Sequence, residues 1–282
     1  MKNKVVSYHY HMKIILSRKG FDSQYGAQAS PILPDGTLLS LPIPDDDELT
    51  YSDIQWNGQS YWDIISSLKP RTTLSKNSHC HLDPDLRECT ISRKDGWKQA
   101  FGQTSSSLTE LRDYGVNIGD LFLFFGWFKE TEYRDGNLRY KYKARNLHVI
   151  YGYMQIGQII DSSSNIPEWL KYHPHANSLN YQSAWDKNQN AIYLPSEHLS
   201  FAPNLPGAGT FKYDKRFILT KSGYSRSRWE FPSNMEGVPI SHNPNGWKPN
   251  YFQSAARGQE FVIDGMPCVM EWVNHLLGVE SL

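Results

Sequence analysis

The sequence has little that would mark a disulfide-bonded, secreted or membrane-spanning protein. Its three cysteines, Cys80, Cys89 and Cys268, show no C-x-x-C spacing, which argues against a disulfide framework and against a zinc ribbon. No apolar run approaches the length of a membrane span, and the N-terminus lacks the apolar core of a signal peptide. We therefore expect a cytoplasmic protein that has no membrane partner.

The chain also lacks an excess of charge of either sign. It has 29 Lys and Arg against 29 Asp and Glu, so the molecule as a whole does not attract a polyanion, and nucleic acid would need a local basic patch. Such patches occur at Arg18 and Lys19, at 139–145 and at 212–228. Aromatic residues make up 13% of the chain, which suits base stacking or sugar binding as well as a bulky core.

No internal repeat or low-complexity tract divides the 282 residues. We expect a single α+β domain over 12–282, with a β-rich mixed central sheet flanked by short helices and long loops, and a poorly ordered extension over 1–11. Residues 119–128 are apolar on both faces of a strand, which predicts a central position in the sheet. Helical pieces are predicted over 61–68, 97–101, 107–114 and 269–277, the third opening on a Ser107-x-x-Glu110 capping box.

Asp22 is the first candidate for chemistry. It follows the apolar strand 14–16 in a loop bounded by Gly20 and Gly26, together with Arg18 and Lys19. A carboxylate at such a place can act as a general base on water or stabilise a developing oxocarbenium ion. The alternative is an exposed Asp that caps a turn and pairs with Arg18.

A second group alternates along the chain at His79, His81, Asp83 and Asp85, so an extended backbone would place these side chains on one face. They suit proton transfer, phosphate contact or a metal such as zinc, and a structural loop is the remaining reading. A metal would need further ligands, for which 173–175 (His-Pro-His) and 197–198 (Glu-His) are the candidates. We assign His81, Asp83 and Asp85 with Asp22 to catalysis and expect no metal and no cofactor.

Two aromatic segments are candidates for substrate binding. Trp127 ends the central strand, where it could face a ligand or belong to the core. Arg226, Arg228 and Trp229 combine guanidinium groups with an indole ring, which suits phosphate binding beside base stacking, although a solvated strand edge explains them equally well. We add Arg18 and Lys19 to this DNA-binding set.

Several ordered segments together resemble the third type of nucleotide modification associated domain. They are 13–22 (KIILSRKGFD), 30–36 (SPILPDG), 41–44 (LPIP), 81–86 (HLDPDL) and 121–128 (LFLFFGWF). The resemblance implies a role in systems that handle modified bases in phage and bacterial DNA. One activity that it implies is a DNA glycosylase of antiviral defence that removes glucosylated hydroxymethylcytosine from bacteriophage DNA. Segments 119–124 and 151–157 are similar, more weakly, to base-reading barrels of the PUA and EVE kind.

The sequence leads to three hypotheses about function. The first is a metal-independent hydrolase, a DNA N-glycosylase that uses base flipping and Asp22 to cleave the N-glycosidic bond. The second is a non-catalytic reader that recruits another enzyme. The third, ranked below both, is metal-dependent hydrolysis at His79 and His81. The first requires that Asp22 and the segment 81–85 line one pocket, with an aromatic ring face and an Arg beside them.

Overall fold

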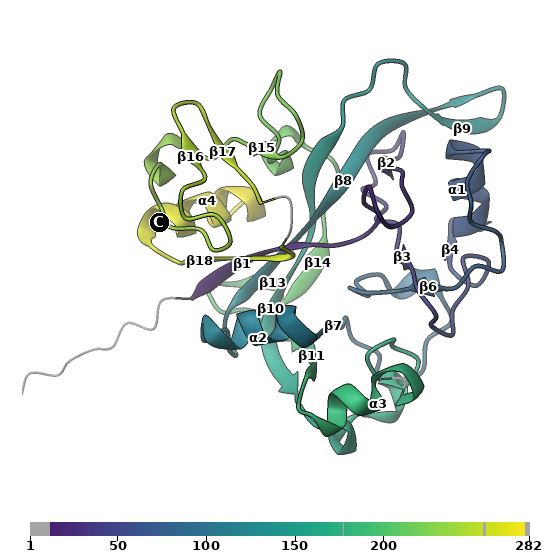
Figure 1. Ribbon diagram of the computed structural model, residues 1–282, viewed down its shortest axis with the longest axis horizontal. Helices are drawn as coiled ribbons and strands as arrows, with labels where there is room; N and C mark the ends of the chain where they lie inside the picture. Colours follow the sequence, from purple (N-terminus) through teal and green to yellow (C-terminus); the bar gives the residue numbers. More distant parts are fainter. Residues whose placement is uncertain (1–11, 177, 256–257, 280–282) are drawn as a thin grey trace, which may run out of the picture.

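The computed structural model describes residues 12–176, 178–255 and 258–279 (Figure 1). Its centre is a nine-stranded sheet in which six strands follow the order β18-β1-β8-β10-β11-β7, while β14 pairs with β10 and both β2 and β9 pair with β8. These strands are β1 (Lys13–Arg18), β2 (Ser30–Ile32), β7 (Phe101–Thr104), β8 (Leu121–Arg134), β9 (Asn137–Tyr140), β10 (Leu147–Ile160), β11 (Asn190–Pro195), β14 (Ala208–Thr210) and β18 (Glu260–Asp264).

The sheet is mixed, as the sequence predicts. Strand β1 runs parallel to β8 and antiparallel to β18, and β8 runs antiparallel to β10. The apolar run at the start of β8, Leu121–Phe125, is fully buried. Burial of consecutive residues, whose side chains point to opposite faces, means that both faces of the sheet are covered at this strand. The prediction of a central strand in an α+β domain is therefore confirmed.

Within the described residues, four α-helices flank this sheet: α1 (Tyr61–Leu68), α2 (Ser105–Asp113), α3 (Ser178–Asp186) and α4 (Pro267–Leu277). Helix α1 starts with a capping box in which Ser60 and Asp63 bond each other's backbone N–H. The capping box predicted at Ser107 is wrong. Strand β7 pairs with β11 as far as Thr104, so α2 begins directly where the ladder ends.

The helix predicted over 97–101 is also wrong. Phe101 opens strand β7, whose backbone hydrogen bonds go to β11, and this pairing overrides the local helical preference. The structure provides no test of the predicted extension, because residues 1–11 lie outside the described residues. Among the helices that are described, none is long and apolar enough to cross a membrane.

Smaller sheets surround the central one. The pair of β3 (Ile43–Pro44) and β6 (Cys80–His81) matters most for the site, because it brings two segments of acidic and His residues together. The others are β4 (Gln55–Trp56) with β5 (Gln59–Ser60), β12 (His198–Leu199) with β13 (Ala202–Pro206), and β15 (Arg228–Trp229) and β16 (Trp247–Lys248) on either side of β17 (Tyr251–Gln253).

Candidate functional site

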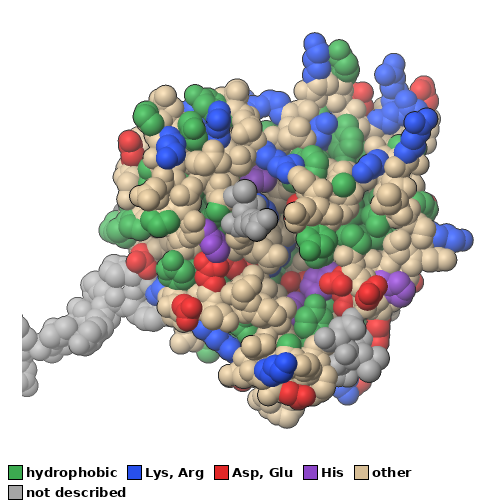
Figure 2. Space-filling view, in the orientation of Figure 1, with side chains coloured by type: hydrophobic (Ala, Val, Ile, Leu, Met, Phe, Trp, Pro, Cys, Tyr) green, Lys and Arg blue, Asp and Glu red, His purple; other side chains and the backbone are tan. Residues whose placement is uncertain are grey.

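A cavity of about 430 Å³ opens in the middle of the face seen in Figure 2, with His and acidic side chains gathered along its lower side. Segments that are far apart in the sequence form its wall: the loop after β1, the β3–β6 pair, the end of β7, the chain leading into α3, and residues 258–259. The lining residues are Arg18, Lys19, Gly20, Asp22, Gln24, Tyr25, Ile43, Asp45, His81, Asp83, Gln103, Thr104, His175, Tyr181, Gly258 and Gln259.

Asp22 is fixed at the edge of this cavity by its own turn. Its Oδ1 accepts hydrogen bonds from the backbone N–H groups of Gln24 and Tyr25, each at 2.7 Å. Gly26 closes the turn with φ +77°, and a Cβ there would overlap the ring of Phe21. Asp22 is therefore a turn residue and a cavity residue at once, and the backbone of the turn sets the position of its carboxylate.

Lys19 faces the cavity, but its charge is already compensated. Its Nζ lies 3.1 Å from Oε1 of Glu260, a fully buried carboxylate that also accepts hydrogen bonds from Ser17 and Gln103. The Lys19 side chain is only 9% exposed and its Nζ lies over the Phe101 ring. The contact of Lys19 with a phosphate stays a prediction, and its pairing with Glu260 fixes the side chain in the cavity wall.

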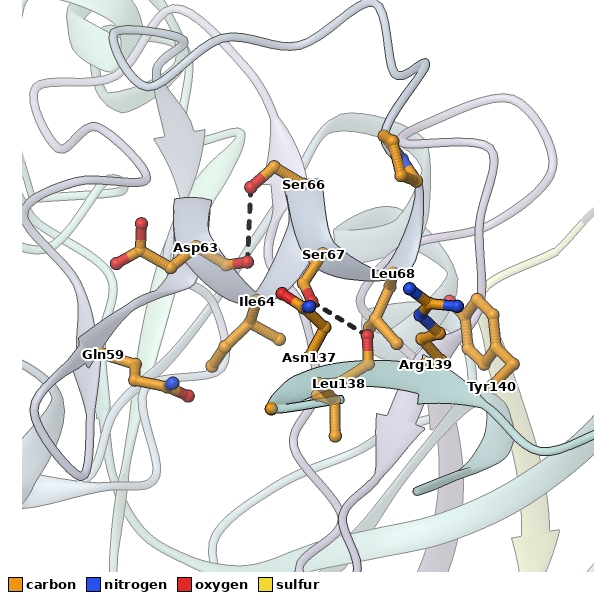
Figure 3. A pocket seen from close by; sticks show the side chains of 12 residues that line it. Gln59, Asp63, Ile64, Ser66, Ser67, Leu68, Asn137, Leu138, Arg139 and Tyr140 are labelled. Atoms are coloured by element: carbon orange, nitrogen blue, oxygen red, sulfur yellow. Dashed lines mark hydrogen bonds between the residues drawn. The ribbon is translucent and has the colours of Figure 1, made fainter. Parts of the chain in front are cut away.

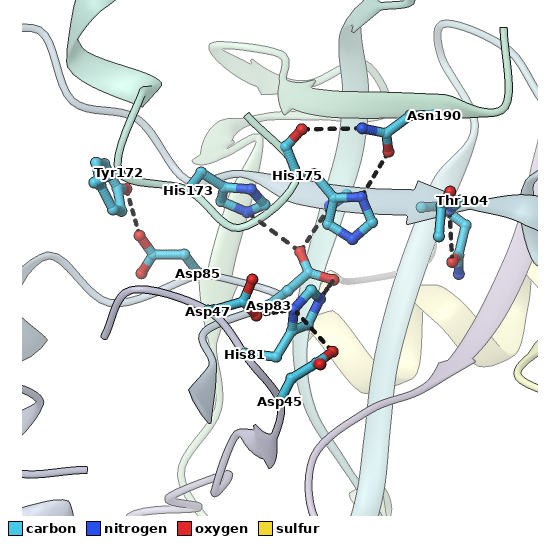
Figure 4. A network of polar contacts seen from close by, with 12 residues as sticks. Asp45, Asp47, His81, Asp83, Asp85, Thr104, Tyr172, His173, His175 and Asn190 are labelled. Atoms are coloured by element: carbon cyan, nitrogen blue, oxygen red, sulfur yellow. Dashed lines mark hydrogen bonds and ion pairs between the residues drawn. The ribbon is translucent and has the colours of Figure 1, made fainter. Parts of the chain in front are cut away.

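His81 and Asp83 line the same cavity as Asp22. Nδ1 of His81 is 2.6 Å from Oδ2 of Asp47, and its Nε2 is 3.9 Å from Oδ2 of Asp83 (Figure 4). Burial by itself lowers the pKa of His81, but the hydrogen bond to Asp47 and the charge of Asp83 outweigh it and raise that pKa. His81 and Asp83 therefore share the cavity with Asp22, as the glycosylase hypothesis requires.

His175 completes this cluster from the segment before α3. Its Nδ1 is 2.7 Å from Oδ1 of Asn190, and its ring stacks on Tyr181 with centroids 4.6 Å apart. Burial lowers the pKa of His175 to about 3, so its imidazole is neutral. Burial raises the pKa of Asp83, but the neighbouring imidazoles, among which His173 has the largest effect, outweigh it and lower this pKa to about 2. The carboxylate is therefore ionised.

Asp85 lies outside the cavity, and we correct its assignment to catalysis. Its carboxylate receives two hydrogen bonds from Arg93, at 2.6 and 2.8 Å, and one from the Tyr172 hydroxyl at 2.5 Å. The side chain is 1% exposed, so substrate has no access to it. The alternation from His79 to Asp85 does not keep the four side chains on one face, because the chain leaves the β6 strand after His81.

The predicted aromatic and basic residues separate into two places. Arg226 stacks on Trp127, with its Cζ 4.1 Å from the ring centroid, and it donates a hydrogen bond to Ser23, the residue after Asp22. Arg228 instead lies over Tyr224 and Tyr251, 5.7 and 5.0 Å from their ring centroids, beside the small β15–β17 sheet. Of Trp127, Arg226 and Arg228, the first two therefore lie beside the turn of Asp22, and Arg228 does not.

Trp229 is a core residue, and its prediction as a stacking platform is wrong. It is fully buried, and its Nε1 donates to Nδ1 of His148 at 3.0 Å. Its ring is enclosed by Phe125, Phe252 and Phe261, so no face is available to a base. The aromatic rings that line the cavity belong to Tyr25 and Tyr181.

Sequence reasoning did not assign His175, Tyr181, Gln103 or Asp47 to the site. One indication of His175 was present in the sequence, because 173–175 was a candidate source of metal ligands. The other candidate source, 197–198, is exposed at the start of β12 and does not line the cavity. The others give no local signal, because they reach the cavity only through strand pairing and helix placement.

A larger hollow of about 940 Å³ lies between α1 and β9 (Figure 3). Its single acidic lining residue, Asp63, is engaged in the α1 capping box, and Ser67 donates to the backbone oxygen of Leu138. Arg139 is the only basic residue among the described residues that line this hollow. Because no set of acid, base or nucleophile converges there, we place the candidate site in the smaller cavity.

A titratable pair borders the site and gives a prediction for stability. Oε2 of Glu110 on α2 is 2.7 Å from Nε2 of His242, whose ring lies against Gly258 in the cavity wall. Burial, with smaller repulsion from Glu260 and Asp113, raises the pKa of Glu110 to about 7, and burial lowers the pKa of His242. Below about pH 7 the Glu110 carboxyl is therefore mainly protonated and can donate a hydrogen bond to the neutral His242 ring.

Because the folded-state pKa of Glu110 exceeds its unfolded value of 4.5, folding favours the protonated carboxyl. This contribution is complete below pH 4.5 and is lost as the pH rises through about 7. Between pH 5 and pH 8, the Tm of the wild type should fall by a few degrees more than the Tm of Glu110→Gln. Glu132→Gln on the β8–β9 hairpin controls for the loss of one acidic side chain; identical profiles for wild type and Glu110→Gln would contradict the assignment.

Comparison with known proteins assigns the chain to a family. The family model described as nucleotide modification associated domain 3 matches residues 13–264, which include every segment that lines the cavity. No curated protein and no solved structure matches the chain. The chain therefore belongs to the nucleotide modification associated domain 3 family, and its function involves modified nucleotides.

Proposed function

We propose that the protein is a DNA glycosylase that hydrolyses the N-glycosidic bond of a modified nucleotide flipped out of the duplex. One observation carries the proposal: carboxylates and imidazoles from distant segments converge on a single cavity. Asp22 lines this cavity together with His81, Asp83 and His175. A pocket built for recognition alone has no need of several ionisable groups at its centre, whereas bond cleavage does.

The cavity has the size and lining for one extruded nucleotide. Its volume of about 430 Å³ lies in the usual range for small-ligand sites, and Tyr25 and Tyr181 offer aromatic rings at its wall. Arg18 lies in the lining, and Arg226 lies beyond Ser23, so guanidinium groups border the cavity where phosphates on either side of a flipped nucleotide would lie.

In this proposal Asp22 acts on the reacting sugar. When the N-glycosidic bond breaks, positive charge develops on the ring, and a carboxylate held in place by two backbone N–H groups stabilises that charge or removes a proton from the attacking water. Asp83 and His81 line the same cavity, where they can contact the base or its modification. A glucosylated hydroxymethylcytosine is the substrate that we propose, because its sugar offers many hydroxyl groups to such polar side chains.

The alternative is a reader that binds the flipped base without chemistry. A reader is best served by an aromatic cage free of carboxylates, whereas Asp22, Asp45 and Asp83 line this cavity. The two functions differ in one experiment. Purified protein is incubated with duplexes that contain cytosine, hydroxymethylcytosine or glucosylated hydroxymethylcytosine at one position. We expect alkali-labile abasic sites and free base only with modified DNA; binding without base release would establish the reader instead.

The two arginines of the 225–230 segment form a matched pair for DNA binding. Arg226→Ala should weaken binding to all DNA sequences and reduce the slope of log K against log salt by about 1, because one phosphate contact near the cavity is lost. Arg228→Ala, on the small β15–β17 sheet, is the control and should leave the slope near that of the wild type. Equal effects of the two variants would move the DNA path away from the Asp22 loop.

A further inference from the structure

Three residues of the cavity each direct one coordinating atom toward a common point while the second polar atom of the same side chain is held by the protein (Figure 4). In His81, Nδ1 is 2.6 Å from the Asp47 carboxylate, which leaves Nε2 toward Asp83. An imidazole that donates one N–H to a carboxylate has its other nitrogen oriented and made more basic, and this is how metal-binding histidines are usually supported.

Asp83 is fixed in the same way. Its Oδ1 accepts the backbone N–H of Gly102 at 2.7 Å and lies 3.3 Å from Nε2 of His173, while Oδ2 faces His81. The carboxylate is buried, so its orientation is set by these protein contacts and not by solvent. One oxygen is therefore used in the fold and one remains directed at the cluster.

His175 supplies the third atom. Nδ1 lies against Oδ1 of Asn190, and the amide of Asn190 also donates to the His175 backbone oxygen at 2.9 Å, so one residue fixes both the ring and the chain. A Cβ at Gly102 would overlap the His175 ring, which shows how closely β7 approaches it. The rings of His81 and His175 are 5.1 Å apart, and Nε2 of His175 is left for the cluster.

We propose that His81, Asp83 and His175 form a binding site for one divalent transition-metal ion of the zinc class. Potential ligand atoms of the three residues all lie within 4.8 Å of one another, and Nε2 of His81 is 3.9 Å from Oδ2 of Asp83. Two ligands of one tetrahedral zinc lie roughly 3.4 Å apart, given bonds of about 2.0–2.1 Å. A closure of about half an ångström between this pair brings its separation to that value.

The surroundings support a cation at this point. Buried His173 stands beside the three residues with its Nε2 3.3 Å from Oδ1 of Asp83, and its Nδ1 has no hydrogen-bond partner among the described residues, so a third imidazole borders the cluster. The neighbouring group of Asp45, Asp47 and His81 fits less well, because Nδ1 of His81 is already bonded to Asp47 and Asp45 is exposed.

Two histidines and one carboxylate leave a coordination position that faces the cavity. Three protein ligands with an open position are the pattern of metal sites that bind substrate or water, whereas structural zinc sites are closed by four protein ligands. The ion would lie in the cavity that Asp22 also lines, where a phosphate or hydroxyl oxygen of a bound nucleotide could occupy the open position. The metal site rests on these contacts alone and does not depend on the glycosylase proposal.

The test measures metal binding and not activity. Full-length protein without a purification tag is stripped with chelator, and Zn²⁺ is titrated against a chromophoric competitor, with bound metal counted by mass spectrometry. Because His9 and His11 could bind zinc by themselves, the reference protein carries His9→Ala and His11→Ala. We expect one tightly bound equivalent in this reference protein.

Within that background, His81→Gln and His175→Ala should each raise the Kd for Zn²⁺ by at least 100-fold. Asp47→Asn, which keeps a hydrogen-bonding group beside His81, should raise it about 10- to 100-fold. His198→Ala on the exposed β12 is the control and should bind like the reference. Circular dichroism verifies that each variant is folded. A reference protein that binds no zinc, or folded His81 and His175 variants that bind it unchanged, would overturn the proposal.

Discussion

Replacing Asp22 by Asn is expected to reduce base release from modified DNA by a factor of about 10²–10⁴, while folding and DNA binding stay close to those of the wild type. The side-chain oxygen of Asn can still accept the N–H groups of Gln24 and Tyr25, so the turn after Phe21 is retained. What disappears is the negative charge and the basicity at the cavity. The rate of appearance of abasic sites under single-turnover conditions measures the effect.

Asp35→Asn is the matched control for this variant. Asp35 also accepts a backbone N–H two residues ahead, from Thr37 at 2.9 Å, but it lies outside the cavity. It should retain wild-type base release. If Asp22→Asn also retains wild-type base release, Asp22 only stabilises its turn, and the reacting carboxylate has to be sought among the other acidic residues of the lining, such as Asp83.

Replacing Asp85 by Asn should cause the largest loss of stability among the candidate residues, about 3–5 kcal/mol in the free energy of unfolding. The substitution keeps the shape of the side chain but leaves the guanidinium of Arg93, which is 7% exposed, without its buried counter-charge. In a protein of this size such a loss lowers Tm by roughly 10 °C or more. Thermal and urea unfolding measure the effect.

Glu168→Gln provides the control, since Glu168 pairs with Lys94 at 3.0 Å on the surface, where both side chains are more than half exposed. An exposed pair of this kind contributes little to the free energy of unfolding, because solvent screens it. At a temperature where Asp85→Asn is folded, its activity should persist because Asp85 does not line the cavity. Wild-type stability combined with lost activity would restore the catalytic assignment made from the sequence.

Some of the site was predictable because its signal is local. The turn at Asp22 follows from a short polar side chain between two glycines, and the strand before it follows from three consecutive apolar residues. The pairing of Asp85 with Arg93 gave no such signal. Alternation along 79–85 predicts a shared face only while the backbone stays extended, and strand β6 ends at His81.

The sequence by itself determined the elements whose period or capping is encoded within a few residues, such as β8, α1 and α4, and it determined the turn that holds Asp22. The tertiary structure decided which distant side chains meet. Asn190 on β11 orients His175, Glu260 on β18 neutralises Lys19, and Gly102 on β7 fixes Asp83. These contacts depend on strand order and register, which are set by the burial of whole faces of the sheet, so no local pattern in the chain specifies them.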